Sequence, residues 1–144
     1  MRLSVRGDYG TRAVLDLARH YGEGLVQNSD IAVRQAIPEP YLHQILLALR
    51  KAGIVRSVRG PRGGHTLARP PEELTLADVM EALEGPIGQD CAEEVSGCAQ
   101  RDLCAVRTVW QGVDKATKRI LSAASIAQLA IGPGGIRPQP MYHI

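Results

Sequence analysis

Apolar residues recur at helical spacing through the first third of the chain. Residues 8–21 place Tyr, Ala, Val and Leu side chains three and four positions apart, with Arg12, Asp16 and Arg19 on the other face, as in an amphipathic helix. A shorter helix is predicted over residues 28–35, opened by the polar triplet that begins at Asn28. A third is predicted over residues 40–52. The second and third helices together form a helix-turn-helix pattern.

The pattern then changes to two short strands, predicted over residues 54–58 and 65–67. They flank the turn Arg59-Gly-Pro-Arg-Gly-Gly64. A β-hairpin with two arginines at its tip has the shape of a wing. A glycine-rich turn can also hold a nucleotide, but this one lacks the Gly-Lys-Ser/Thr ending and opens no helix. The nucleotide-binding interpretation is therefore set aside.

Two further helices and a tail are predicted in the second half. Thr75 and Asp78 resemble a capping box at the start of a helix that ends before Gly85. A long helix follows, with apolar positions in alternating steps of three and four, which is coiled-coil spacing. These positions are Leu103, Val106, Trp110, Val113, Thr117, Ile120 and Ala124. Such a seam requires a partner helix, so we expect a homodimer; packing of this helix on its own domain is the alternative.

All three cysteines of the protein lie in one segment, as Cys91, Cys98 and Cys104. A disulfide framework prefers an even number of cysteines, and a structural zinc site usually shows closely paired ones. Three soft thiolates short of one partner suit an iron–sulphur cluster with one non-cysteine ligand. Spacing alone leaves redox-active thiols and zinc as alternatives.

Composition limits the surroundings in which this chemistry takes place. The chain has 144 residues, 44% of them hydrophobic, with no Phe and one Trp, so an aliphatic core of ordinary size is expected. The first residues do not resemble a signal peptide, and no stretch approaches the length of a membrane span. We therefore expect a cytoplasmic protein, in a compartment where thiols stay reduced.

Charge is divided unevenly between the two halves. Residues 1–69 contain eleven Lys and Arg against five Asp and Glu, whereas residues 70–144 contain six against ten. A basic half of this kind indicates a polyanionic partner, because each neutralised phosphate releases counterions. An ordinary solvated surface rich in arginine is the alternative.

Several stretches together resemble one family. They are the opening Met1-Arg-Leu-Ser-Val-Arg-Gly-Asp-Tyr9, the segment Tyr41-Leu-His-Gln-Ile-Leu46, the segment from Leu49 to Gly64, and the three spaced cysteines. The chain resembles the bacterial winged-helix iron–sulphur transcription regulators that include IscR, NsrR and RirA. The resemblance implies a dimeric transcription factor, usually a repressor, that reads a palindromic operator on double-stranded DNA.

The resemblance also implies a division of the chain. The expected fold is mainly α with a small β-hairpin wing. Residues 1–84 would form the winged helix-turn-helix DNA-binding domain and residues 85–104 the cluster-binding loop. Residues 103–130 would form the dimerisation helix and a short terminal helix, and residues 131–144 a flexible tail. No enzyme activity is expected, since a cysteine nucleophile would need a histidine relay close by.

The same resemblance assigns the residues that would contact DNA. The second helix of the pair would enter the major groove, and Arg59 in the wing would enter the minor groove. The predicted contact residues are Ser29, Pro40, Tyr41, His43, Gln44, Arg50, Arg59, Arg62 and Gly64. Gln can bond adenine through two hydrogen bonds, and His can donate to guanine. Members similar to IscR carry Glu in place of His43, so their operator sequence does not transfer to this chain.

The fourth ligand follows from two departures within the family. Members similar to IscR supply a His three residues after the last cysteine, where this chain has Arg107, which cannot ligate. Members similar to NsrR use an Asp of the first helix, from the other subunit, and this chain has Asp8. The resemblance therefore implies that Cys91, Cys98, Cys104 and Asp8 hold a cluster, 4Fe–4S rather than 2Fe–2S. Helix capping is the alternative role for Asp8, and Glu93, Glu94, a water or a small thiol are alternative ligands.

A regulatory hypothesis connects the cluster to DNA binding. The signal sensed would be iron, nitric oxide or redox state. Loss of the cluster under iron shortage, or its reaction with nitric oxide or oxygen, would release Asp8 and shift the two recognition helices, weakening operator binding. The alternative is a regulator of the same fold that responds to redox state through its cysteine thiols or through zinc, without a cluster.

Overall fold

The computed structural model describes residues 3–88 and 101–132, without the side chains of residues 101–104. Nine helical and strand segments follow one another in this part of the chain. They are α1 (Val5–Arg19), α2 (Asn28–Gln35), α3 (Glu39–Lys51), β1 (Val55–Val58), β2 (Gly64–Leu67), the 3₁₀ helix η1 (Pro71–Glu73), α4 (Leu76–Glu84), α6 (Arg101–Ala123) and α7 (Ile126–Ile131).

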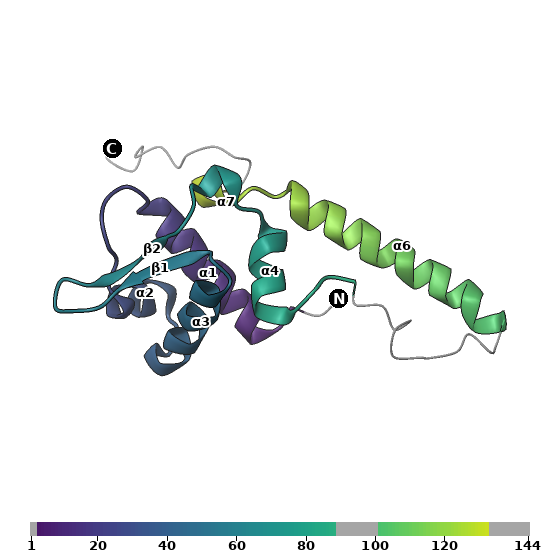
Figure 1. The fold of residues 1–144 in the computed structure, drawn as a ribbon, viewed down its shortest axis with the longest axis horizontal. Helices are drawn as coiled ribbons and strands as arrows, with labels where there is room; N and C mark the ends of the chain where they lie inside the picture. Colours follow the sequence, from purple (N-terminus) through teal and green to yellow (C-terminus); the bar gives the residue numbers. More distant parts are fainter. Residues whose placement is uncertain (1–2, 89–100, 133–144) are drawn as a thin grey trace, which may run out of the picture.

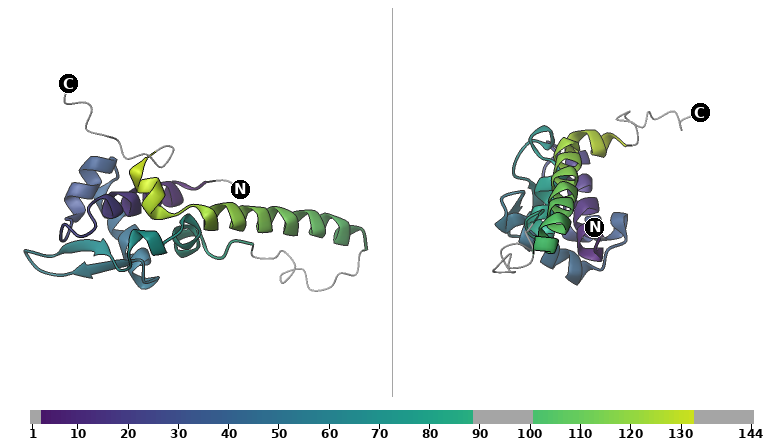
Figure 2. Two further views of the ribbon diagram at one scale, coloured as in Figure 1. Left: turned by 90° about the horizontal axis from the view of Figure 1, so that it is seen from above. Right: turned by 90° about the vertical axis from the view of Figure 1, so that its right-hand side faces the viewer.

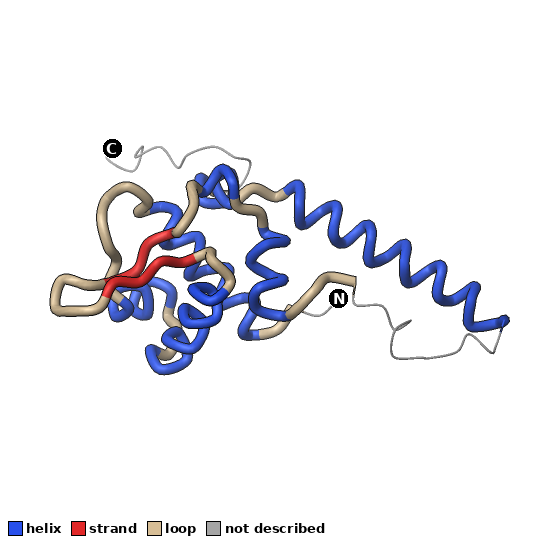
Figure 3. Tube along the Cα trace, viewed as in Figure 1, coloured by secondary structure: helices blue, strands red, loops and turns tan. Residues whose placement is uncertain are grey.

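Most of these elements gather into one body, and α6 extends away from it (Figure 1). The hairpin lies at the end of this body opposite to α6, as the left-hand view of Figure 2 also shows. β1 and β2 are antiparallel, with Val55 opposite Leu67 and Val58 opposite Gly64. Figure 3 shows one pair of strands among helices. The predicted fold class, mainly helical with a small hairpin wing, is confirmed.

The first helix begins earlier than the sequence pattern predicts. Ser4 is its N-cap, and its hydroxyl accepts a hydrogen bond from the Gly7 amide at 2.9 Å. Asp8 therefore lies inside the first turn and is not the cap, although the interaction of its carboxylate with the helix dipole still stabilises the helix. The alternative role of Asp8 as the capping residue is replaced by Ser4.

The start of α2 also differs from the prediction. Its N-cap is Gln27, with no side-chain capping bond. The Asn28 side chain instead donates to the Glu39 carboxylate, 3.2 Å away at the start of α3. This contact joins the two helices of the pair across their connection. A residue that is a good cap by local chemistry has been recruited by a tertiary contact.

The cap predicted for α4 is present. The Thr75 hydroxyl accepts from the Asp78 amide at 3.3 Å, and the Asp78 carboxylate accepts from the Thr75 amide at 2.9 Å. Both partners lie within four residues of each other, so local sequence is sufficient to specify them.

The core is aliphatic and draws on α1 to α4, both strands and α7. Its largest fully buried side chains include Leu17 from α1, Ile31 from α2, four residues from α3, Leu74 and Val79 from the α4 region, and Ile126 from α7. Burying each such side chain contributes about 1.5–3 kcal/mol. The core thus packs α1 against both helices of the helix-turn-helix and against the base of the hairpin.

The end of α6 is fixed to this body by main-chain hydrogen bonds. The Leu76 amide donates to the Ala124 carbonyl at 2.8 Å, and the Ile126 amide donates to the Leu74 carbonyl at 2.9 Å. Ile126 is fully buried. The direction in which α6 leaves the body is therefore set by its C-terminal end.

The rest of α6 exposes an apolar face. Val106, Trp110, Val113 and Ile120 of the predicted seam are all exposed, Trp110 to 60%. Near the body α6 passes α4, where Lys118 lies 3.9 Å from Glu81. Packing on its own domain therefore does not cover the seam, and the exposed face is large for a single helix in water.

Candidate functional site

Helix α3 presents a polar face and buries an apolar one. Leu42, Ile45, Leu46 and Leu49 are buried, whereas Pro40, His43, Gln44 and Arg50 are exposed and Tyr41 is half-buried. This division follows the helical period. The residues of this helix that are predicted to contact DNA therefore lie on its accessible side, and their contact with DNA stays a prediction.

Tyr41 has a second role that the sequence did not indicate. Its ring meets the Tyr9 ring edge-on, with centroids 5.7 Å apart and an interplanar angle of 75°. The Arg12 guanidinium lies 4.9 Å from the centroid of the Tyr9 ring. Edge-to-face aromatic pairs are worth about 0.5–1.5 kcal/mol beyond burial. These contacts join the start of α3 to α1.

The wing carries Arg59 and Arg62, both exposed, at its tip. Close backbone contacts hold the residues next to this tip. A Cβ on Gly63 would lie 2.1 Å from the Val58 carbonyl, and one on Gly64 would lie 2.7 Å from the Val26 carbonyl. The Gln27 side chain also donates to the Gly63 carbonyl. Gly64, predicted to contact a ligand, is therefore required by packing as well.

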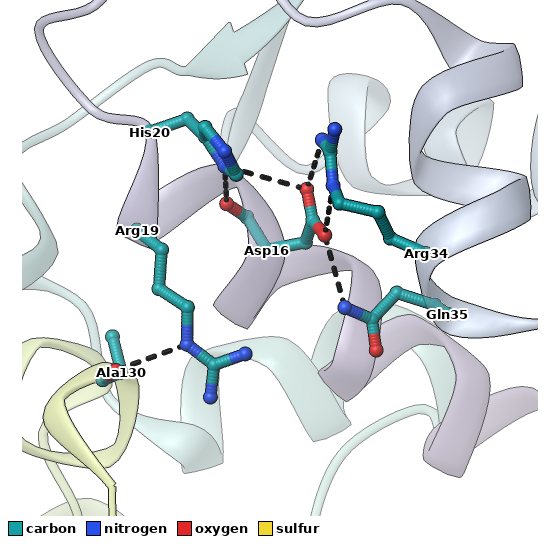
Figure 4. A network of polar contacts seen from close by, with 6 residues as sticks. All are labelled: Asp16, Arg19, His20, Arg34, Gln35 and Ala130. Carbon is teal, nitrogen blue, oxygen red and sulfur yellow. Dashed lines mark hydrogen bonds and ion pairs between the residues drawn. The ribbon is translucent and has the colours of Figure 1, made fainter. Parts of the chain in front are cut away.

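A buried carboxylate joins α1 to α2 (Figure 4). Asp16 is 2% exposed. Arg34 donates to its two oxygens at 3.0 and 2.8 Å, and Gln35 donates to it at 2.9 Å. Burial by itself raises the pKa of Asp16, but the hydrogen bonds from Arg34 and Gln35 and the adjacent positive charge outweigh it, so the pKa lies below its usual value. The prediction that Asp16 lies on the solvent face of α1 is wrong.

The same end of α1 holds α7. Arg19 donates to the Ala130 carbonyl at 3.0 Å, and the His20 ring nitrogen Nδ1 lies 2.8 Å from the Asp16 carbonyl oxygen. Figure 4 shows these contacts around one turn of α1. Helix α1 is thus a central support, in contact with the helix-turn-helix on one side and the C-terminal helix on the other.

Asp8, the predicted non-cysteine ligand, is accessible and already paired. Its side chain is 47% exposed, and Oδ2 lies 3.0 Å from an Arg12 nitrogen. Arg12 also donates to the Gln35 carbonyl at the end of α2, at 2.9 Å. The carboxylate therefore suits an exchangeable metal ligand, and its present partner touches the helix-turn-helix.

Of the four predicted ligands, Asp8 is the one whose side chain lies in the described part of the chain. Cys91 and Cys98 lie outside the described residues, and Cys104 lies in the first turn of α6, where no side chain is described. That turn is at the end of α6 farthest from α1 (Figure 1), and 23 residues of helix span about 34 Å. Among the described residues, no group of three metal-ligating side chains is present.

A further polar side chain, His65, was missed by sequence reasoning. It lies opposite Ser57 in the hairpin, and the Ser57 hydroxyl is 2.7 Å from His65 Nδ1. Burial lowers the pKa of His65, and the charges of His43 and Arg50 lower it further. Counting the strand residues outward from the turn places His65 opposite Ser57, and this register is the sequence signal that could have identified the pair.

None of the described helices is long and apolar enough to cross a membrane.

Comparison with known proteins agrees with this architecture. The Rrf2 family model, described as an iron-dependent transcriptional regulator, matches residues 3–131. The chain is 39% identical over 132 residues to protein rrf2 of Nitratidesulfovibrio vulgaris, covering 90% of this chain and 87% of that protein. The solved structures that are similar to it include these two. One is CymR, the global cysteine regulator of B. subtilis, with a TM-score of 0.76 and 33% identity over 90% of this chain and 96% of that one. The other is T. potens IscR, with a TM-score of 0.71 and 37% identity over 88% and 84%.

Proposed function

The chain belongs to the Rrf2 family of transcriptional regulators, and we propose that it is a homodimeric, DNA-binding repressor controlled by an iron–sulphur cluster. The family resemblance inferred from the sequence is confirmed. The matched family model and CymR are both described as transcriptional regulators. A regulator of this kind must read DNA and must sense a signal, and different residues of this chain would carry the two tasks.

The observation that carries the proposal is the shared surface of α3 and the wing. α3 exposes His43, Gln44 and Arg50, and the wing exposes Arg59 and Arg62. A helix of this size fits the major groove, and an arginine at a narrow hairpin tip suits the minor groove. Because both are supported by one core, they would bind the duplex as a rigid unit.

Ser29 is exposed in the first turn of α2, where it would contact a phosphate of the DNA backbone. Hydroxyls and amides at a helix start commonly bind phosphate. Phosphate contacts of this kind position the protein, while His43 and Gln44 would supply the sequence preference. The operator would be palindromic, because a two-fold symmetric dimer presents two identical DNA-binding domains.

The homodimer is supported by the uncovered seam of α6. A helix of about 34 Å with Trp110 exposed would bury this face against a second copy with the same spacing. We therefore propose that residues 103–130 supply the dimer contact and residues 1–84 the DNA-binding domain. Residues 85–104 would carry the cluster-binding cysteines.

The proposed sensor consists of Cys91, Cys98, Cys104 and, from the other subunit, Asp8, holding a 4Fe–4S cluster. When bound, the cluster would supply reactivity toward oxygen or nitric oxide, and under iron shortage its site would be left empty. Among the proposed ligands, Asp8 is the one whose side chain the structure describes. Its exposed carboxylate is held by an exchangeable ion pair with Arg12, which suits a metal ligand.

Exchange of Asp8 between iron and Arg12 would couple the state of the cluster to the helix-turn-helix. Arg12 donates to the Gln35 carbonyl of α2 and lies over Tyr9, which packs on Tyr41 of α3. When Asp8 leaves Arg12, the guanidinium loses its ion pair at the point where α1 supports both helices. The orientation of α3 would then depend on whether Asp8 is a ligand.

The cluster is tested by purifying the full-length protein without oxygen and measuring iron, acid-labile sulphide and visible absorption. We expect a brown protein, an Asp8→Ala variant with a changed or labile spectrum, and a Cys104→Ser variant without it. Asp30→Ala, which removes an exposed carboxylate from α2, is the matched control and should keep the wild-type spectrum.

A colourless wild-type protein that still binds DNA would exclude the cluster and support the second candidate. That candidate is a regulator that responds through cysteine thiols or zinc, and the similarity to a protein described as a global cysteine regulator favours it. Zinc analysis and thiol titration before and after mild oxidation would then separate the two remaining versions.

A further inference from the structure

If α3 lies in the major groove and the wing in the neighbouring minor groove, one strand of the duplex must pass between them. The two grooves are separated by a single sugar-phosphate backbone at each crossing. The protein surface between α3 and the hairpin would therefore face phosphate groups. This step depends on the proposed DNA-binding function, and on no particular operator sequence.

A cavity of about 180 Å³ lies at that place. α3 contributes His43 and Arg50 to its lining, and the hairpin contributes Ser57, Arg59 and His65. Apolar side chains complete the wall. Within the described part of the chain, no carboxylate lines this cavity. Its polar lining is thus made of groups that donate hydrogen bonds or carry positive charge, which suits an anion.

His65 is held in this cavity by several contacts. Its main chain pairs with Val26, where two N–H to carbonyl hydrogen bonds of 2.8 Å form an antiparallel bridge. Its ring nitrogen Nδ1 lies 2.7 Å from the Ser57 hydroxyl. Nε2 is therefore the ring nitrogen left to meet a ligand. The imidazole is prepositioned, so little side-chain entropy would be lost on binding.

We propose that this cavity is a subsite for a backbone phosphate of duplex DNA, contacted by His65 in its protonated form, so that DNA binding takes up a proton. The proposal deepens the proposed function by assigning one ligand group to one side chain. It also adds a dependence on pH that does not involve the cysteines or Asp8.

The charges around His65 give the direction of this linkage. In the free protein, burial holds the pKa of His65 below its usual value, and His43 and Arg50 of α3 hold it lower still. Arg59, in the turn that follows β1, also lines the cavity. A phosphate would introduce the missing negative charge and raise the pKa. Each unit by which the pKa rises corresponds to about a tenfold gain in affinity on acidification.

The test measures binding of a labelled random-sequence duplex of about 30 base pairs by fluorescence anisotropy, since phosphate contacts do not require an operator. The full-length protein is used, with its thiols reduced, at constant ionic strength between about pH 6 and pH 8. The variants are His65→Gln and His43→Gln. His20→Gln is the matched control, because His20 lies beside Asp16 at the end of α1 and does not line the cavity.

For the wild type and His20→Gln, we expect affinity to rise about tenfold as pH falls across this range. His65→Gln should lose most of this rise in affinity, whereas His43→Gln should keep most of it. A His65→Gln variant with the wild-type pH dependence would overturn the subsite while leaving DNA binding intact. A wild-type protein that does not bind duplex even at low salt would overturn the proposed function, and the subsite with it.

A second measurement guards against misfolding of the variant. The His65 imidazole of the wild-type protein is titrated by NMR, alone and with saturating duplex. We expect its pKa to rise on binding. A His65 pKa that is the same in the free protein and in the complex would refute the proposal regardless of how the variants behave.

Discussion

Replacing Asp16 with Ala should destabilise the protein more than the loss of any exposed carboxylate. Asp16 accepts two hydrogen bonds from Arg34 and one from Gln35 while its own side chain is almost completely buried. Hydrogen bonds to a charged group contribute about 1.5–3 kcal/mol each, and breaking a buried pair costs about 3–5 kcal/mol. The Arg34 side chain is 40% exposed, so water would partly replace its lost partner. We therefore expect a loss of about 3 kcal/mol, or roughly 10 °C in Tm.

The assay is urea unfolding followed by circular dichroism at neutral pH, with Glu23→Ala as the control because Glu23 is exposed in the loop after α1. The pH dependence provides a second check. The folded-state pKa of Asp16 is lowered, so its stabilising effect is fully present above the unfolded value of about 3.9 and is lost as pH falls through the folded pKa. The gap between wild type and variant should narrow below about pH 4. Equal midpoints for Asp16→Ala and Glu23→Ala at neutral pH would refute the reasoning.

Three further changes test other parts of the structure. Trp110→Glu places a charge in the apolar seam and should convert the homodimer to a monomer, as measured by light scattering. The control Val33→Glu, on the exposed side of α2, should remain a dimer. Unchanged dimers in both variants would contradict the assigned seam. Ile126→Ala should cost about 2–5 kcal/mol of unfolding free energy, since this side chain is fully buried, and a change under about 0.5 kcal/mol would contradict its anchoring role. Arg59→Ala should weaken duplex binding and reduce its salt dependence by about one counterion, whereas Arg69→Ala, beyond the wing, should not.

Local patterns specified most of the fold. The apolar stripes of α1 and α3, the capping box of Thr75 and Asp78, and the glycine-rich turn of the wing each involve residues close in sequence. Their outcome depends little on distant parts of the chain. For that reason these elements, and the exposure of His43 and Gln44, could be predicted from sequence.

Errors arose where a distant partner competed with local chemistry. Asp16 has the periodicity of a solvent-facing residue, and it is buried because Arg34, on another helix, neutralises it. Asn28 would be a good helix cap, but Glu39 accepts its side-chain hydrogen bond. The cavity around His65 could not be predicted from local sequence, because its lining comes from α3 as well as from the hairpin. Each of these features depends on which elements pack together, and a single sequence does not contain that information.

The geometry of α6 makes the proposed dimer and the proposed fourth ligand depend on each other. One end of this helix is fixed to the body through Ala124 and Ile126, and its first turn, with the backbone of Cys104, lies at the other end (Figure 1). Asp8 lies on α1, which belongs to the body, and the part of α6 from Cys104 to its end at Ala123 spans about 30 Å. This length of helix separates the Cys104 backbone from the body that carries its own Asp8. If two copies pair antiparallel along the seam, the first turn of one α6 approaches the body of the other. A monomeric Trp110→Glu protein should therefore also lose the Asp8-dependent part of the cluster spectrum, and a monomer that retains it would separate the two proposals.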